Sequence, residues 1–424
     1  MRPNAARNAL ASAFLALIGV LLVAAGFLAA IIVVDGNEVD TAPTAVADVP
    51  AMPPPTVAAS GRGAVYSALI DEIIAILEDD FVEPVDGAAL LEAAINGMVT
   101  SLGDPHVAYI DPPTFAVSRG DFRGAFQGIG ATIAQQDNYV VIVQPLPGTP
   151  AERAGLRSGG IILEVDGEST AGWSVNEAVL RLRGEIGSTV ELLIRHADGS
   201  EERVAITRDE ILVASVDTEP PGGVLMDGGA SKVADLAYIR IHTFTARTPT
   251  ELRRAVEDVG DVSGLILDLR SNRGGLLVET METADLFLDG QTIVVQVDRD
   301  GHEQVFRAEP GVLTDLPLVI LQDEFSASGS ELLAAALQEN DRAVVVGTPS
   351  FGKGTVSLPR ELSNGGALYV SIARWLTPDR NLIEGRGVIP DIAVELTAED
   401  VEEQRDVALH RAIDVLRARV PTSL

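Results

Sequence analysis

The feature that most constrains this chain is an uncharged run rich in Leu, Ala, Ile and Val, which extends from Ala9 to Val34. Its 26 residues exceed the ~20 that a helix needs to cross the core of a bilayer. Two arginines precede the run and two acids follow it, so the positive-inside rule places the N-terminus in the cytoplasm. The apolar part of a cleaved signal peptide is usually only ~7–15 residues long. We therefore expect residues 1–34 to form an uncleaved single-pass transmembrane anchor, with the rest of the chain extracytoplasmic, in the periplasm or on the outer face of the cell membrane.

Composition narrows the functions open to the remaining chain. A chain of 424 residues with a formal net charge of −31 is expected to hold two to three domains and to repel phosphate backbones, so we expect no nucleic-acid partner. The chain lacks cysteine, which excludes disulfides, zinc–thiolate sites and a cysteine nucleophile. The five histidines are scattered and no H-E-x-x-H pattern occurs, so we expect no catalytic metal and no other cofactor. A Ser-His-Asp triad stays open, because its members need not be close in sequence.

The balance of basic residues singles out one lysine. Of the 31 basic residues only Lys232 and Lys353 are lysine, and the others are arginine. Arginine keeps its proton in proteins, whereas a buried lysine can lose it. Lys353 can therefore mark a position where arginine cannot serve, although two lysines can also be the remainder of a compositional bias.

Changes of pattern along the chain divide it into six segments. The predicted segments are an anchor at 1–34, a Pro/Ala-rich linker at 35–60, a helical segment at 61–121, a small β-rich domain at 122–212, an α/β core at 213–397 and a C-terminal helix at 398–424. The helical segment is expected to hold two amphipathic helices between about Val65 and Thr100. Such a pair suits a docking or dimerisation element as readily as a lid.

The two central segments mix strands and helices differently. In the first, strands are expected at Val140–Val143, Ile161–Val165 and Val190–Arg195, around one helix at Asn176–Arg183. In the second, the apolar runs Leu265–Leu269 and Leu318–Leu321 are typical of strands buried on both faces. Helices are expected there at Glu251–Asp258, Glu279–Phe287 and Glu331–Gln338, and a last one at Ala398–Ala418. The expected fold class is an α/β catalytic core with an inserted small β-rich domain and an N-terminal helical segment.

The most informative segment runs from Val319 to Glu331, with the sequence V-I-L-Q-D-E-F-S-A-S-G-S-E. A buried strand is expected to end here, a turn of small residues follows, and a helix begins. Free N–H groups at a helix N-terminus favour a developing anion, which suits a serine nucleophile. The same residues fit a capping box, with Ser328 as the N-cap and Glu331 at N3. The two roles can also be split, with a neighbouring serine as the cap.

A second segment surrounds the lysine. Gly347 to Lys353 spells G-x-x-x-x-G-K, the pattern of a phosphate-binding P-loop without its last residue. A P-loop needs Ser or Thr after the lysine and then a helix. This chain continues with Gly354 and an extended run from Thr355 to Pro359, so we expect no nucleotide site. The local alternative is an exposed lysine in a glycine loop.

A serine and a lysine can form a catalytic dyad. A neutral lysine amine can take the serine proton and later return it to the leaving amine. The lysine must be partly desolvated so that its pKa falls. The glycines of Asp268–Gly275, which follow a buried strand, can turn backbone N–H groups toward a carbonyl and so supply an oxyanion hole.

Five segments in order make the chain resemble the carboxyl-terminal processing (tail-specific) protease family. They fall within about residues 63–418 and are Ser101–His106 (S-L-G-D-P-H), Asp268–Gly275 (D-L-R-S-N-R-G-G), Phe325–Glu331 (F-S-A-S-G-S-E), Phe351–Gly354 (F-G-K-G) and Gly387–Asp391 (G-V-I-P-D). The resemblance implies Ser328 as the nucleophile and Lys353 as the general base. The family usually has a glutamine four residues beyond the lysine, which helps to orient it, and this chain has Ser357 there. A hydroxyl can still bond the amine, but its reach is shorter.

The resemblance also implies two backbone binding sites. The oxyanion hole falls on Gly274, Gly275 and Gly329. The β-rich segment looks like a PDZ domain, whose carboxylate-binding loop falls on Gln127, Gly128, Ile129 and Gly130. A PDZ domain adds a peptide as an extra strand and captures its C-terminal carboxylate on backbone N–H groups. An ordinary hairpin turn is the alternative for these glycines.

Taken with the anchor, the resemblance implies a serine endopeptidase that cleaves exported proteins near their C-terminal tails. Its expected partners are protein or peptide substrates with free C-terminal tails and the membrane, through the N-terminal helix, and a homo-oligomer is left open. The alternative function is a catalytically weak PDZ scaffold that binds tails at the membrane, which Ser357 keeps open.

Overall fold

The computed structural model describes residues 61–121, 123–136, 138–218, 235–403 and 405–419. The predicted anchor and linker, residues 1–60, lie outside these residues. Among the described helices, none combines the length and the hydropathy that a bilayer span requires.

A six-stranded sheet lies at the centre of the largest domain. Its order is β10-β11-β12-β15-β16-β19, and every neighbouring pair is parallel except β10 and β11. The strands are β10 (Val216–Asp217), β11 (Leu236–Ile241), β12 (Gly264–Asp268), β15 (Leu318–Gln322), β16 (Ala343–Gly347) and β19 (Ile392–Ala393). Strands β12, β15 and β16 are buried along their whole length, which explains why their sequences are so apolar.

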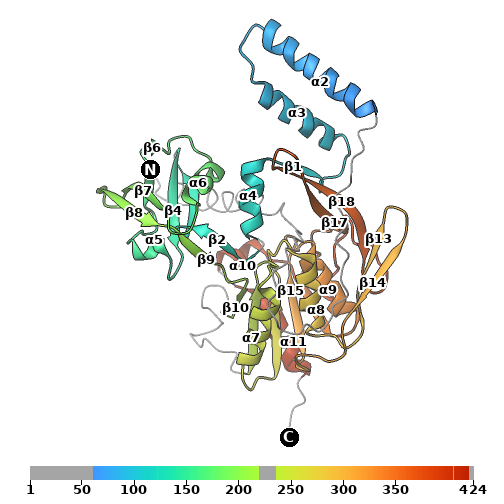
Figure 1. The fold of residues 1–424 in the computed structure, drawn as a ribbon. Coiled ribbons are helices and arrows are strands. Elements are labelled where there is room, and N and C mark those ends of the chain that lie inside the picture. Colours follow the sequence, from blue (N-terminus) through green and yellow to red (C-terminus); the bar gives the residue numbers. More distant parts are fainter. Residues whose placement is uncertain (1–60, 122, 137, 219–234, 404, 420–424) are drawn as a thin grey trace, which may run out of the picture.

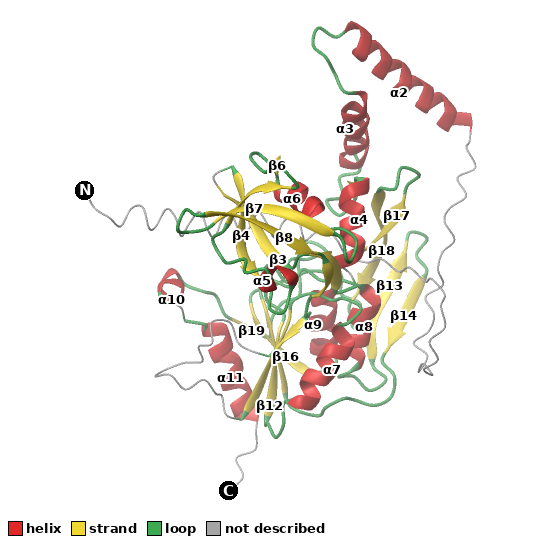
Figure 2. Cartoon of the chain, turned by 60° about the vertical axis from the view of Figure 1, so that its left-hand side comes forward, coloured by secondary structure: helices red, strands yellow, loops and turns green. Residues whose placement is uncertain are grey.

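Helices cover both faces of this sheet (Figure 2). The helices α7 (Thr248–Asp258), α8 (Leu277–Asp285) and α9 (Gly329–Glu339) share a hydrophobic core with one face, and α11 (Val407–Arg419) packs on the other. Along β12 the side chains alternate between the two cores, because Leu265 and Leu267 face the first and Ile266 faces the second. The predicted α/β core is confirmed, and the structure shows that its sheet is mainly parallel.

The single C-terminal helix predicted at Ala398–Ala418 is wrong, because the chain forms α10 (Ala398–Glu402) and then α11. The Asp406 carboxylate accepts the backbone N–H of Leu409 at 3.0 Å, which is the bond of a helix N-cap. A new helix therefore begins here.

A second, antiparallel sheet stands beside the parallel one. Its strands are β1 (Ala108–Ile110), β13 (Thr292–Asp298), β14 (Glu303–Arg307), β17 (Thr355–Glu361) and β18 (Ala367–Leu376). Strand β17 begins two residues after Lys353, and its pairing with β18 shifts register between Val356 and Ser357. The extended structure predicted after Lys353, in place of a P-loop helix, is therefore confirmed.

The predicted β-rich domain is also confirmed. Its main sheet contains β3 (Ala131–Gln136), β4 (Tyr139–Pro145), β5 (Ile161–Val165), β6 (Glu168–Ser169), β7 (Thr189–Arg195) and β8 (Glu201–Thr207), and β2 (Ala125–Gly128) pairs separately with β9 (Asp209–Leu212). The helix α6 (Val175–Leu182) begins with a capping box between Ser174 and Glu177. A short α5 (Pro150–Arg153), which the sequence pattern did not predict, is added.

The N-terminal helices form a hairpin that projects from the body of the molecule (Figure 1). They are α2 (Gly61–Asp80) and α3 (Gly87–Thr100), and α4 (Pro112–Asp121) follows the strand β1. Apolar side chains of α2 remain exposed, with 53% of Leu69 and 49% of Ile73 accessible to solvent. The hairpin therefore presents an apolar surface that no other described part of the chain covers.

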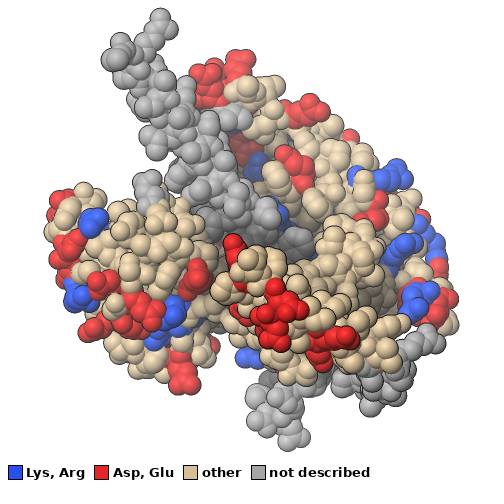
Figure 3. Space-filling view, turned by 90° about the horizontal axis from the view of Figure 1, so that it is seen from above, with Lys and Arg blue, Asp and Glu red and all other residues tan. Residues whose placement is uncertain are grey.

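Acidic side chains form several patches on the surface seen from above the molecule (Figure 3). In Figure 3 they spread over much of the visible face, whereas the basic side chains lie mainly toward its two sides. The abundance of acidic side chains agrees with the formal net charge of −31.

Candidate active site

Ser328 lies at the carboxyl end of the parallel sheet, where β15 turns into α9. It is the N-cap of α9 and has a φ of 55° and a ψ of −112°. A residue other than glycine rarely adopts a positive φ, and such strain at a strand-to-helix turn exposes a nucleophile in other hydrolases. The conformation therefore sets Ser328 apart from an ordinary helix cap.

The neighbouring serines have other partners. The Ser326 hydroxyl donates to the carbonyl of Leu269 at 2.9 Å, and the Ser330 hydroxyl donates to the carbonyl of Asn272 at 2.6 Å. Both bonds tie the turn to the segment after β12. Ser328 is itself the N-cap, as the capping-box interpretation predicted, and the alternative of a neighbouring serine as the cap does not apply.

The buried carboxylate of Glu331 joins the two candidate catalytic segments. It accepts the N–H of Ser328 at 2.7 Å and that of Lys353 at 2.9 Å, and it also accepts the N–H of Gly352 and the hydroxyl of Ser350. Burial raises the pKa of this carboxyl, and the four hydrogen bonds oppose that rise. Sequence reasoning assigned Glu331 only the cap, because its bonds to the Lys353 loop span about 20 residues.

Lys353 sits in the loop between β16 and β17. Burial lowers the pKa of its amine from the ordinary value of 10.5, and the charges of Asp104, Glu331 and Glu384 oppose this shift. The Trp375 ring donates its N–H to the Lys353 carbonyl at 3.1 Å, which anchors the backbone beside the side chain. A desolvated lysine of this kind has the chemistry of a general base.

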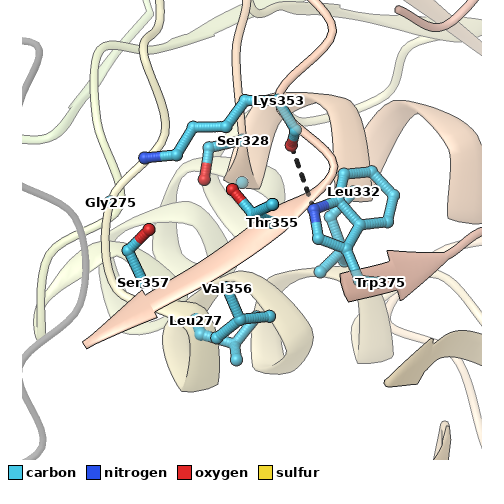
Figure 4. A pocket seen from close by; sticks show the side chains of 10 residues that line it. Gly275, Leu277, Ser328, Leu332, Lys353, Thr355, Val356, Ser357 and Trp375 are labelled. Atoms are coloured by element: carbon cyan, nitrogen blue, oxygen red, sulfur yellow. Dashed lines mark hydrogen bonds between the residues drawn. The ribbon is translucent and has the colours of Figure 1, made fainter. Parts of the chain in front are cut away.

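Ser328 and Lys353 line the same small pocket, of about 20 Å³. Its lining residues are Gly275, Leu277, Ser328, Gly329, Leu332, Lys353, Thr355, Val356, Ser357 and Trp375. In Figure 4 the Lys353 side chain extends past Ser328, and its amine lies on the same side as the hydroxyls of Ser328 and Ser357. No hydrogen bond joins the Ser328 hydroxyl to the amine, as is common in enzymes without substrate.

Ser357 is buried on β17 and lies in the pocket with the other two residues. Its oxygen points toward the lysine side chain in Figure 4. The hydroxyl of Ser371, opposite it on β18, lies 3.5 Å away. Sequence reasoning missed Ser371, because strand pairing alone brings it there.

The three glycines predicted for the oxyanion hole differ in their hydrogen bonds. The N–H of Gly274 donates to the side chain of Asn272 at 2.8 Å, so this donor is occupied, and its predicted role is corrected on that ground. No hydrogen bond is found for the N–H of Gly275 or Gly329 within the described chain, and both residues line the pocket. The N–H groups of these two glycines are therefore available to an oxyanion in the pocket.

The motif Ser101–His106 also reaches the site, although sequence reasoning gave it no role. The His106 ring lies 3.4 Å from the Glu384 carboxylate, which accepts the N–H of Gly354 at 2.7 Å. Asp104 accepts the N–H of His106 at 2.8 Å, and its charge is the largest of those that raise the lysine pKa. The motif therefore supplies negative charge beside Lys353.

The predicted peptide-binding loop at 127–130 spans the end of β2 and the turn into β3. Gly128, Ile129 and Gly130 are buried, and the Ile129 side chain belongs to the core of the β-rich domain. Within the described residues the N–H groups of Ile129 and Gly130 make no hydrogen bond. The N–H of Gly184 approaches the Gln127 carbonyl at 3.4 Å, so that residue is tied to the end of α6. The loop therefore retains two free donors.

One group of potential metal ligands is present in the described residues, at the exposed turn between β13 and β14. It consists of Asp298, Asp300 and His302. The Asp298 carboxylate accepts hydrogen bonds from the other two residues, so the cluster is explained by the turn itself. None of the three lines the pocket of Ser328 and Lys353.

Three family matches agree with this geometry. Residues 235–394 match Peptidase family S41, residues 122–195 match the PDZ domain, and residues 62–114 match the N-terminal domain of the activating protease CtpB. The S41 match contains both Ser328 and Lys353, and the PDZ match contains the loop at 127–130.

Individual relatives extend the match over most of the chain. The carboxy-terminal processing protease CtpA of Bacillus subtilis is 33% identical over 76% of this chain and 67% of its own length. A carboxy-terminal-processing protease of Bartonella bacilliformis is 35% identical over 81% of this chain and 78% of its own. Among solved structures, a photosystem II D1 C-terminal processing protease is 28% identical, with a TM-score of 0.46 over 82% of this chain and 96% of its own. The chain therefore belongs to the S41 family of carboxy-terminal processing serine proteases, with a PDZ domain.

Proposed function

We propose that this protease is an endopeptidase in which Ser328 is the nucleophile and Lys353 the general base, and that it cleaves exported proteins near their C-terminal tails. The observation that carries the proposal is the shared pocket, in which a desolvated lysine lies beside a strained serine at a helix N-terminus. Each feature alone has a structural explanation, but together they supply a nucleophile and its base.

The chemistry follows from these positions. The neutral Lys353 amine takes the Ser328 proton while the serine oxygen attacks the substrate carbonyl. The carbonyl oxygen becomes an anion that the N–H groups of Gly275 and Gly329 stabilise. The lysine then gives its proton to the leaving amine, and water repeats the cycle on the acyl-enzyme. In this scheme Ser357 orients the lysine amine, the role that the resemblance gives to a glutamine.

The PDZ domain gives the proposed reaction its selectivity for tails. The free N–H groups of Ile129 and Gly130 support carboxylate capture at the loop 127–130. A substrate held by its C-terminus would place a bond some residues upstream of the tail within reach of Ser328. The substrates are then proteins or peptides with free C-terminal tails.

The location remains a proposal from the sequence. The length of Ala9–Val34 and the arginines before it support an uncleaved anchor, which would hold the body on the extracytoplasmic side. N-terminal sequencing of the mature protein tests this, because a start after about residue 28 would mean that the segment is removed.

The exposed apolar face of α2 supports a homo-oligomer as a further part of the proposal. Val65, Leu69 and Ile73 lie at helical spacing and are 64%, 53% and 49% exposed. Sedimentation of the detergent-solubilised full chain, compared with Leu69→Glu, tests whether this face joins copies of the chain.

The decisive experiment is digestion of an unfolded substrate with an apolar C-terminal tail. Wild-type full chain should cleave it, and Ser328→Ala should not. Lys353→Arg should also be nearly inactive, because arginine keeps a positive charge but cannot take a proton near neutral pH. An active Lys353→Arg would show that the lysine acts only as a charge. Tail binding by the wild type without any cleavage would favour the alternative of a catalytically weak scaffold.

A further inference from the structure

The hydroxyl of Thr355 is a buried polar group without a partner. Its oxygen is shielded from solvent and, among the described residues, makes no hydrogen bond. A buried hydroxyl in this state costs about 1–3 kcal/mol, so most are satisfied in native proteins. Such an orphan calls for an explanation, and active sites are places where this cost is retained for function.

The surroundings of Thr355 are those of the candidate active site. It is the first residue of β17 and lines the pocket of Ser328 and Lys353. Figure 4 shows its oxygen directed toward the Ser328 hydroxyl, whereas the Ser357 oxygen is directed toward the lysine side chain. The two hydroxyls of β17 therefore point toward different residues of the dyad, Thr355 toward Ser328 and Ser357 toward Lys353 (Figure 4).

The hydrogen-bonding capacity of Ser328 leaves a place for this hydroxyl. A serine oxygen carries one donor and two acceptor sites. In the proposed reaction the donor points to Lys353 and one lone pair attacks the carbonyl, so the second lone pair remains free. A donor at that lone pair would hold the oxygen in its attacking rotamer and stabilise the negative charge that develops as the proton leaves.

We propose that Thr355 is a positioning residue for Ser328, whose hydroxyl donates a hydrogen bond to the Ser328 oxygen during attack on the substrate. The inference rests on the proposed role of Ser328 and Lys353. The serine proton still passes to the lysine amine, the serine oxygen still forms the bond to the carbonyl carbon, and Thr355 keeps its own proton throughout. In the described residues the threonine hydroxyl makes no hydrogen bond, so in this proposal the bond forms when the Ser328 oxygen turns to attack the substrate.

Thr355→Val in the full chain tests the inference, since valine has nearly the same shape and lacks only the hydroxyl. We expect kcat to fall roughly tenfold to hundredfold, the worth of one hydrogen bond to a developing charge, with KM unchanged. The melting temperature should stay the same or rise, because an unsatisfied buried hydroxyl is removed. Thr355→Ser should restore most of kcat, and Thr292→Val on β13 serves as the matched control.

Each other outcome overturns the proposal. An unchanged kcat of Thr355→Val would show that the Thr355 hydroxyl does not contribute to the reaction. A raised KM with the same kcat would assign it to substrate binding, and a lowered melting temperature together with lost activity would assign it to the fold. Failure of this inference is separable from failure of the dyad, because Ser328→Ala and Lys353→Arg are assayed beside it. If those two variants cleave like the wild type, the dyad itself is wrong.

Discussion

The backbone N–H groups of Ser328 and Lys353 donate to the same carboxylate oxygen of Glu331, at 2.7 and 2.9 Å. The two residues are 25 positions apart in sequence and lie on different loops. One buried side chain therefore fixes the separation of the proposed nucleophile and its base. A shift of either loop would break a charge-assisted hydrogen bond, which is stronger than a neutral one.

Glu331→Gln should lower both stability and activity. The amide keeps one acceptor oxygen and replaces the other with an NH₂ group, which cannot accept from backbone N–H groups. At least one buried donor then faces another donor, at a cost of about 1–3 kcal/mol. Thermal unfolding and kcat measure the two effects. Glu279→Gln on α8 is the control, and equal behaviour of the two variants would contradict the role of Glu331.

Gly274→Ala should abolish most activity although the glycine N–H is not free for an oxyanion. Gly274 has a φ of 98°, and a Cβ there would lie 2.9 Å from the Ser328 Cβ and 2.8 Å from the Gly329 nitrogen. The added methyl must therefore displace the serine. Gly290→Ala is the control, since Gly290 has a φ of 76° but no atom near its Cβ position. Full activity of Gly274→Ala would show that the turn can relax without harm.

The pH dependence of cleavage should report the lysine amine. Burial lowers the pKa of Lys353, so kcat/KM should rise with pH through a midpoint below the value of 10.5 that is ordinary for lysine. The Asp104 charge favours the protonated amine and opposes this shift. Asp104→Asn should therefore move the profile to lower pH, because a smaller fraction of the amine is protonated at each pH.

The matched control for this profile is Asp79→Asn. Asp79 is an exposed acid of α2. Its substitution makes the same change in net charge at a position far from Lys353 in the sequence. A profile that moves equally in both variants would reflect net charge alone. A move of the Asp104→Asn profile to higher pH would contradict the assigned sign.

Tail capture should depend on the free carboxylate. A peptide with an apolar C-terminus should bind the protein more tightly as the acid than as the amide, because the N–H groups of Ile129 and Gly130 meet the carboxylate. Gly130→Ala should remove this preference, since its Cβ would lie 2.4 Å from the Thr149 Cβ. Gly172→Ala, with open space at its Cβ position, is the control. Fluorescence anisotropy of labelled peptides measures both effects.

The sequence could predict the architecture because its signals are local. Apolar runs such as Leu318–Leu321 predicted strands buried on both faces, and their alternation with helices predicted an α/β core. The family motifs supplied the positions of Ser328 and Lys353. Contacts between distant loops carried no such signal. Neither the bond from Gly274 to Asn272 nor the pairing of Ser357 with Ser371 can be seen without strand register and the path of the turn.

The break in the C-terminal helix shows the same limit on a smaller scale. The periodicity of Ala398–Ala418 continues across the break, where the cap at Asp406 begins a new helix. Aspartate is common on helix surfaces, so its role as a cap emerges only when the backbone turns.

Ser357 stands where the resemblance to the family implies a glutamine, and its substitution gives the sharpest test of how the lysine is oriented. The side chain is buried in the pocket and its hydroxyl lies 3.5 Å from that of Ser371. If the hydroxyl holds the amine, Ser357→Ala should lower kcat several-fold while KM stays unchanged. Ser357→Gln should keep or raise the rate, because the longer amide reaches the amine directly. Ser371→Ala separates the two hydroxyls, since it should have a smaller effect if Ser371 only supports Ser357. Cleavage by Ser357→Ala at the wild-type rate would mean that another group orients Lys353, and that the role carried over from the family does not apply at this position.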